Sequence, residues 1–196
     1  MNESALVNIT AATASEICAR LYLDKAALGV LRPGMSPREF VEALVEQKQY
    51  LAAIDFIAHA LPARAAIWWG CLSLQRTMGD KLEPWERRAL RLTVQWVFLP
   101  DEANRAATRQ PADVLGPASP AGALAAAANQ TGGSLGPPDG PVIPPSPFAP
   151  ARAVAIAIKL ASSKCPPPEI QGTQRSLIDL GIAIAEGQFA PKGVQA

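Results

Sequence analysis

One uninterrupted apolar run constrains the fold more than any other feature of the sequence. It covers residues 65–72, AAIWWGCL, and lies in a longer stretch, residues 50–78, that Pro62 divides into two predicted helices. Successive residues of an α-helix are turned by about 100°, so a run of this length covers every side of the helix. A helix that is apolar all round is buried. We therefore expect the helix that Pro62 opens to be the centre of the molecule, with other helices packed around it.

The rest of the chain is typical of further helices separated by turns. Ser36 is a predicted N-cap, Pro37 takes the first helical position and Glu39 completes a capping box. No segment shows the strict alternation of apolar and polar residues that is typical of strands. The first helix is predicted from Ser15 to Leu28, and further helices begin at or near residues 37, 50, 62, 84, 100, 121, 151 and 173.

A proline-rich segment interrupts this pattern at residues 131–150. It contains seven prolines and four glycines, which exclude a helix or a central strand and favour an extended, polyproline-like path. The two helices after it are too small a unit to bury a core of their own. We therefore expect the segment to be a strap that is ordered on the surface, resists a broad-specificity protease and is anchored by Val142, Ile143 and Phe148.

These features predict an all-α fold with one domain, an irregular bundle or a solenoid-like stack over residues 15–187. The ends, residues 1–14 and 188–196, are expected to be flexible. The three cysteines are far apart and fit no zinc-binding spacing, which favours a reducing, cytoplasmic location. We expect no metal and no cofactor.

Composition argues against two classes of partner. Charged residues make up only 18% of the chain and its net charge is +1. Binding to nucleic acid or to an anionic membrane surface usually requires a clustered basic face. No apolar stretch reaches the roughly 18 residues that a membrane span needs. The sequence therefore predicts neither nucleic acid nor a membrane as a partner.

Few residues are candidates for chemistry. His59 is the only histidine, and Asp55 precedes it by one helical turn, so a local hydrogen bond is favoured over catalysis. Arg64 lies in the first turn of the central helix, where a cation opposes the helix dipole. It is expected to pair with a carboxylate from a neighbouring helix, and ligand binding is the alternative. We expect no catalytic residues and no enzymatic activity.

Interaction residues are predicted on the surface and beside the central helix. Three arginines of the helix after Pro84 lie close together, and they form either a solvated helix face, which is favoured, or a face that contacts a partner. Trp85 and Trp96 are expected in the core. The candidate interaction residues are Arg64, Trp69, Arg87, Arg88, Arg91, Val142, Ile143 and Phe148.

Several short strings together resemble an uncharacterised bacterial family of all-helical proteins. They are FIAHALP (56–62) running into Arg64 and AIWW (66–69), Asn104-Arg105, GGSL (132–135) before the proline-rich run, and GIAIAEG (181–187). The resemblance covers residues 36–187. The chain departs from the family at Ala65, where the family has an acid, and at Asn129-Gln130, where it has an aromatic–Trp pair.

The resemblance implies a setting but no activity, because the family carries no assigned function. Its genes are associated with type VI secretion, which implies an adaptor or chaperone whose partner is a secretion-system tip protein or an effector. The alternative hypothesis is an enzyme or a small-molecule-binding protein with a pocket near His59, Arg64 and Trp69.

Overall fold

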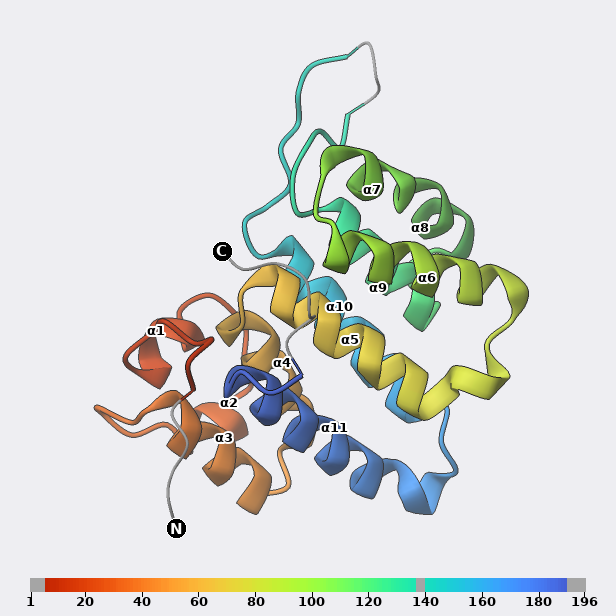
Figure 1. The fold of residues 1–196 in the computed structure, drawn as a ribbon. Helices are drawn as coiled ribbons and strands as arrows, with labels where there is room; N and C mark the ends of the chain where they lie inside the picture. The colour runs from red at the N-terminus through yellow and green to blue at the C-terminus, as the bar shows by residue number, and fades with distance from the viewer. Residues whose placement is uncertain (1–5, 137–139, 190–196) are drawn as a thin grey trace.

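The computed structural model describes residues 6–136 and 140–189, and these residues form helices without a strand (Figure 1). The predicted all-α fold is thereby confirmed. Two short 3-10 turns, η1 (Gly79–Lys81) and η2 (Pro167–Glu169), join longer elements. The α-helices are α1 (Ala14–Cys18), α2 (Lys25–Leu28), α3 (Pro37–Glu46), α4 (Tyr50–Ala60), α5 (Ala63–Met78), α6 (Pro84–Phe98), α7 (Glu102–Ala107), α8 (Arg109–Leu115), α9 (Pro120–Asn129), α10 (Ala149–Ser163) and α11 (Ile170–Ala185).

The helices α3, α5 and α6 begin where the sequence predicts, at local capping residues and prolines. At the start of α3, the Glu39 N–H donates to Ser36 Oγ at 3.3 Å, and the Ser36 N–H donates to Glu39 Oε2 at 2.7 Å. The bond from the Ser36 backbone lowers the pKa of Glu39. Pro62 is the N-cap of α5, and Pro84 is the first residue of α6. These starts depend on neighbouring residues alone, which is why the sequence specifies them.

The central position of α5 is confirmed, but its burial is one-sided. It packs against α4, α6, α9, α10 and α11. Trp69 and Leu74 are fully buried, whereas Trp68 and Leu72 are half-buried and Gln75 is exposed. The helix that is buried on nearly every side is α9, in which small alanines let neighbours approach closely. The expectation that α5 is covered all round is therefore wrong.

The C-terminal helices share this core. α10 packs against α9, α5 and α4, and α11 packs against α4 and α5. The indole N–H of Trp69 donates to the carbonyl oxygen of Leu177 in α11 at 2.8 Å. A Cβ atom on Gly181 would lie only 2.9 Å from the same indole ring, so α11 approaches α5 closely here because this residue has no side chain.

The segment between α9 and α10 does not follow the surface as the predicted strap does. In Figure 1 the described parts of this segment, residues 131–136 and 140–147, project away from the helices beside α7. Val142 is 77% exposed and Ile143 49% exposed, so the expectation that these two residues anchor the segment is wrong. The segment bonds to itself instead, because the Leu135 N–H donates to the Ile143 carbonyl at 2.8 Å. Phe148 is half-buried, with its ring centroid 6.3 Å from that of His59. Residues 137–139, which belong to the predicted strap, lie outside the described residues.

Two further expectations are corrected. The helix predicted over residues 15–28 is two short helices, α1 and α2, because the Asp24 carboxylate accepts the Ala27 N–H at 2.8 Å and starts a new helix. Trp85 is 47% exposed, so it is not a core residue. Of the predicted N-terminal tail, residues 6–13 are described, and Asn8 bonds to the C-terminal turn of α11 through the Ile184 and Ala185 carbonyls. Among the described helices, none combines the length and apolar character that crossing a membrane requires.

Candidate functional site

A largely apolar groove lies between α5 and α6. The two helices follow each other through η1 and run side by side in opposite directions (Figure 1). Its volume is about 270 Å³. Its lining residues come from one side of each helix and from the turn between them: Trp68, Cys71, Leu72 and Gln75, then Leu82, Arg87, Leu90, Arg91 and Val94.

Aromatic side chains extend the apolar surface beyond one end of the groove. Trp68 and Phe98 pack edge to face, with ring centroids 5.6 Å apart and ring planes at 76°. The Trp68 indole N–H donates to the Phe189 carbonyl at 2.6 Å, which fixes the orientation of the ring. The side chains of Phe98, Leu99 and Phe189 are 40%, 58% and 59% exposed. Exposed apolar residues gathered beside a groove are typical of protein-interaction sites.

Arginines of α6 form the positively charged side of the groove. Arg87 donates to the Leu82 carbonyl at 2.9 Å, so its guanidinium also holds the turn before α6. Arg88 lies over the Trp85 ring, with its guanidinium carbon 5.3 Å from the ring centroid. Arg91 lines the groove and is exposed, and among the described residues no carboxylate lies within 4.0 Å of it. No acidic residue lines this groove, so its charge is positive.

Arg64 and Trp69 have structural positions in this arrangement. The Arg64 Nε donates to the Val97 carbonyl at 2.7 Å, in the last turn of α6. The carbonyl end of a helix is the negative end of its dipole, and it takes the place of the carboxylate that is expected from the sequence. Trp69 is 0% exposed, so it belongs to the core and to no surface on which a partner can bind.

His59 makes the local hydrogen bond that the sequence predicts, although with a backbone group. Its Nδ1 lies 2.8 Å from the Asp55 carbonyl oxygen, while the Asp55 carboxylate pairs with Lys159 at 2.7 Å. Nε2 is buried and has no hydrogen-bond partner among the described residues. Burial lowers the pKa of His59, because the charged imidazolium is poorly solvated there. This state suits a neutral core histidine.

His59, Arg64 and Trp69, the residues of the alternative hypothesis, do not line one common cavity. A cavity of about 570 Å³ lies beside His59, and its other lining residues include Arg20, Tyr22 and Arg152. Neither Arg64 nor Trp69 lines it. Across residues 6–136 and 140–189, no group of three or more histidine, cysteine, aspartate or glutamate side chains is arranged to hold a metal ion.

Comparison with known proteins assigns the chain to a family without assigning a function. The sequence model of a family of unknown function, DUF6931, matches residues 40–185. The chain belongs to this family. The match runs from α3 to the end of α11 and therefore includes the groove. No curated protein and no solved structure matches the chain. The expected membership of an uncharacterised family is thereby confirmed.

The strings that carry the resemblance meet in space. Gly181 of the last string lies against Trp69 of the first. Arg105 donates to the Asn129 carbonyl at 2.6 Å and lies against Gly133, where a Cβ atom would be only 2.2 Å from its guanidinium. These strings build the core and the base of the projecting segment. The arginine side of the groove follows from the sequence, whereas its apolar wall does not. The half-buried pair Leu72 and Val94 lies on two helices, and only their packing joins it into one surface.

Proposed function

We propose that this protein is a non-catalytic interaction module that holds an apolar helical segment of a partner protein in the α5–α6 groove. The observation that carries this proposal is an apolar floor with a positively charged side in one cavity between two helices. Leu72 and Trp68 are one turn apart on α5, and Leu90 and Val94 are one turn apart on α6. Such a surface complements an amphipathic helix whose anchors lie one turn apart.

The charge of the groove specifies the partner further. Arg87 and Arg91 line it, and no acidic side chain does. A partner segment with acidic residues beside its apolar anchors therefore fits better than a neutral or basic one, because complementary charges favour association and exclude wrong partners. Val142 and Ile143, which project from the body with their side chains exposed, provide a second contact on the same partner.

The biological setting of this proposal is an adaptor or chaperone in bacterial type VI secretion, acting in the cytoplasm. Its partner there is a secretion-system tip protein or an effector. The resemblance of the short sequence strings is the support for this setting. The groove supports the interaction role independently of the setting.

Binding to products of neighbouring genes tests the proposal. The chain is co-expressed with each neighbour, and the dissociation constant of any complex is measured by calorimetry. Arg91→Glu reverses a charge of the groove and Val94→Glu places a charge in its floor. We expect each to weaken binding at least tenfold, about 1.4 kcal/mol. Arg175→Glu makes the same charge change on an exposed residue of α11 outside the groove and leaves binding unchanged. Failure of every neighbour to bind, or equal losses in all three variants, contradicts the proposal.

A further inference from the structure

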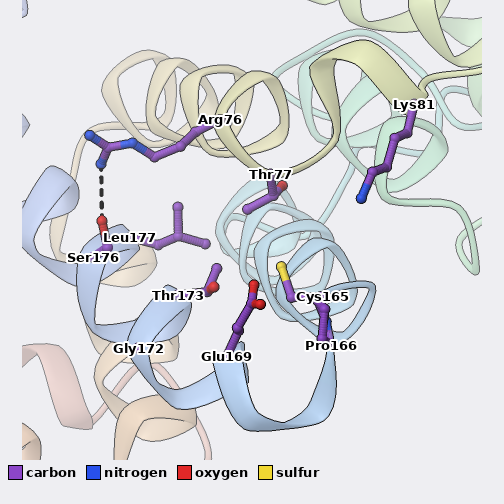
Figure 2. A pocket seen from close by; sticks show the side chains of 10 residues that line it. All are labelled: Arg76, Thr77, Lys81, Cys165, Pro166, Glu169, Gly172, Thr173, Ser176 and Leu177. Carbon is purple, nitrogen blue, oxygen red and sulfur yellow. Dashed lines mark hydrogen bonds between the residues drawn. The ribbon is translucent and has the colours of Figure 1, made fainter.

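A second cavity, about 510 Å³ in volume, differs from the groove in being polar and charged (Figure 2). It lies between the C-terminal end of α5 with η1 on one side and the turn from α10 into α11 on the other. We call it the α5–α11 cleft. Its lining residues come from both sides: Arg76, Thr77 and Lys81, then Cys165, Pro166, Glu169, Gly172, Thr173, Ser176 and Leu177.

Three charged side chains of the cleft are not neutralised by one another. Figure 2 shows Arg76 and Lys81 towards opposite ends of one wall, with Glu169 on the facing wall. Arg76 Nη1 donates to Ser176 Oγ at 3.2 Å. Within the part of the chain that the structure describes, no ion pair within 4.0 Å includes any of the three. The cleft therefore presents two cations and one anion to solvent, together with hydroxyl groups of Thr77 and Thr173.

Gly172 gives an independent reason to regard the cleft as a binding site. Gly172 is the third residue of α11 and lies in its first turn, where glycine is no more favourable to the helix than alanine. Gly181, on the same helix, has a packing reason to be glycine because the Trp69 ring lies against it. At Gly172, which lines the cleft and is exposed, no side chain and no backbone of another element among the described residues lies within 4 Å of the position that a Cβ would take. A bare backbone there lets a small molecule approach the helix closely.

We propose that the α5–α11 cleft binds a small zwitterion that carries a second carboxylate, of which L-glutamate is a simple example. One carboxylate is held by Arg76 and Ser176, because a guanidinium matches carboxylate geometry with two donors. The second carboxylate lies at Lys81, and the ammonium group lies at Glu169. This ligand has a charge of −1, opposite to the net charge of the three side chains. The inference does not depend on the proposed role of the groove.

Cys165 provides a direct measurement, since its half-buried thiol lines the cleft. The full-length chain is alkylated with iodoacetamide, and the rate at each cysteine is followed by peptide mass spectrometry. We expect L-glutamate to slow alkylation of Cys165 by about tenfold at about ten times its Kd, since only the free protein reacts. Cys18, half-buried on α1 and outside the cleft, is the internal control and reacts at an unchanged rate.

Ligand analogues and variants test each assigned contact. Succinate lacks the ammonium group and L-glutamine lacks the second carboxylate, so each is expected to protect Cys165 more weakly. Gly172→Leu fills the cleft with a side chain that favours the helix. In this variant we expect L-glutamate to leave the alkylation rate of Cys165 unchanged. We expect the thermal unfolding midpoint of the variant to stay at or above that of the wild type. Arg76→Gln is expected to weaken protection as well.

Three outcomes overturn the inference. In the first, L-glutamate at millimolar concentration leaves the alkylation rate of Cys165 unchanged. In the second, it protects Cys165 equally well in Gly172→Leu. In the third, succinate protects Cys165 as well as L-glutamate does, which would remove the assigned contact between Glu169 and an ammonium group. Because the groove plays no part in these measurements, their failure leaves the proposed interaction role standing. Loss of partner binding in the groove variants likewise leaves the cleft unaffected.

Discussion

At the scale of single residues, two glycines of α11 have opposite surroundings and make a matched pair. Gly181→Ala introduces a Cβ at 2.9 Å from the Trp69 ring and 3.0 Å from Ile57. We expect it to lower the free energy of unfolding by about 1–3 kcal/mol, the usual cost of overpacking a core. Gly172→Ala meets open space and is expected to raise the same quantity by up to about 1 kcal/mol. Urea unfolding of both variants measures the difference, and equal effects would contradict the close packing of α11 on α5.

His59 predicts a pH dependence of stability. Its pKa in the folded protein is lowered, chiefly by burial, from an unfolded value of about 6.5. Below pH ~6.5 the unfolded chain therefore takes up a proton that the folded chain does not, so stability falls as the pH falls toward the folded pKa. Asp55, Arg152 and Lys159 are the charged groups that act on this histidine, and Asp55 partly offsets the effect.

The comparison of the wild type with His59→Asn isolates this effect, because carboxylates that titrate in the same range contribute to both proteins. We expect the difference in unfolding free energy between the two to shrink as the pH falls from 7 toward 5. The measurement is urea unfolding at a series of pH values. A difference that is constant across this range would show that His59 titrates normally in the folded protein.

The sequence predicts the hydrogen-bond partners of some of these side chains but not of others. The bond between His59 and Asp55 lies within one helical turn, so the sequence contains both partners. Arg64 bonds to a carbonyl of α6, and the sequence shows no partner because backbone carbonyls carry no residue-specific signal. The burial of Trp69 and the exposure of Trp85 likewise depend on which helix faces which neighbour.

At the scale of elements, an ion pair links α10 to α4. Lys159 Nζ lies 2.7 Å from Asp55 Oδ1, and the two side chains are 29% and 25% exposed. Solvent screens a pair of this exposure, so a double-mutant cycle with Lys159→Met and Asp55→Asn is expected to give a coupling of only about 0.2–1 kcal/mol. A coupling of several kcal/mol would mean that the pair is shielded from solvent. The packing of α10 on α4 therefore depends mainly on apolar burial.

Most helix boundaries follow from the sequence because prolines and capping residues act locally. The prediction of a single first helix is wrong because Asp24 caps a second helix in the middle of an apolar pattern. α8 was missed because Pro111 lies inside it, although proline is tolerated in the first turn of a helix. The groove was missed because its walls belong to two helices that are each ordinary amphipathic segments. Apart from these two cases, what the sequence did not specify is how the helices pack against one another.

At the scale of the whole molecule, the last two helices are required for folding. Val154, Ile158 and Leu177 are fully buried. Each buried aliphatic side chain contributes about 1.5–3 kcal/mol, and the total stability of a domain is only about 5–15 kcal/mol. A chain truncated after Gly136 is therefore expected to lose cooperative thermal unfolding, as followed by circular dichroism at 222 nm. A truncated chain that retains a sharp transition would show that the N-terminal helices form a core without α10 and α11.

A cut in the backbone of the projecting segment is expected, unlike truncation, to leave the helices packed together. Sequence reasoning predicted a strap that resists proteolysis, but Val142 and Ile143 are exposed. A protease that cleaves beside large apolar residues is therefore expected to cut here before it cuts any helix. The two fragments should stay together, because α10 packs on α9, α5 and α4 and the indole of Trp69 bonds across to α11. Size-exclusion chromatography of the cut protein is expected to give one peak at the elution volume of the intact chain, and two fragments only in denaturant. Separation in native buffer would mean that the segment links two independent units, and would contradict the shared core.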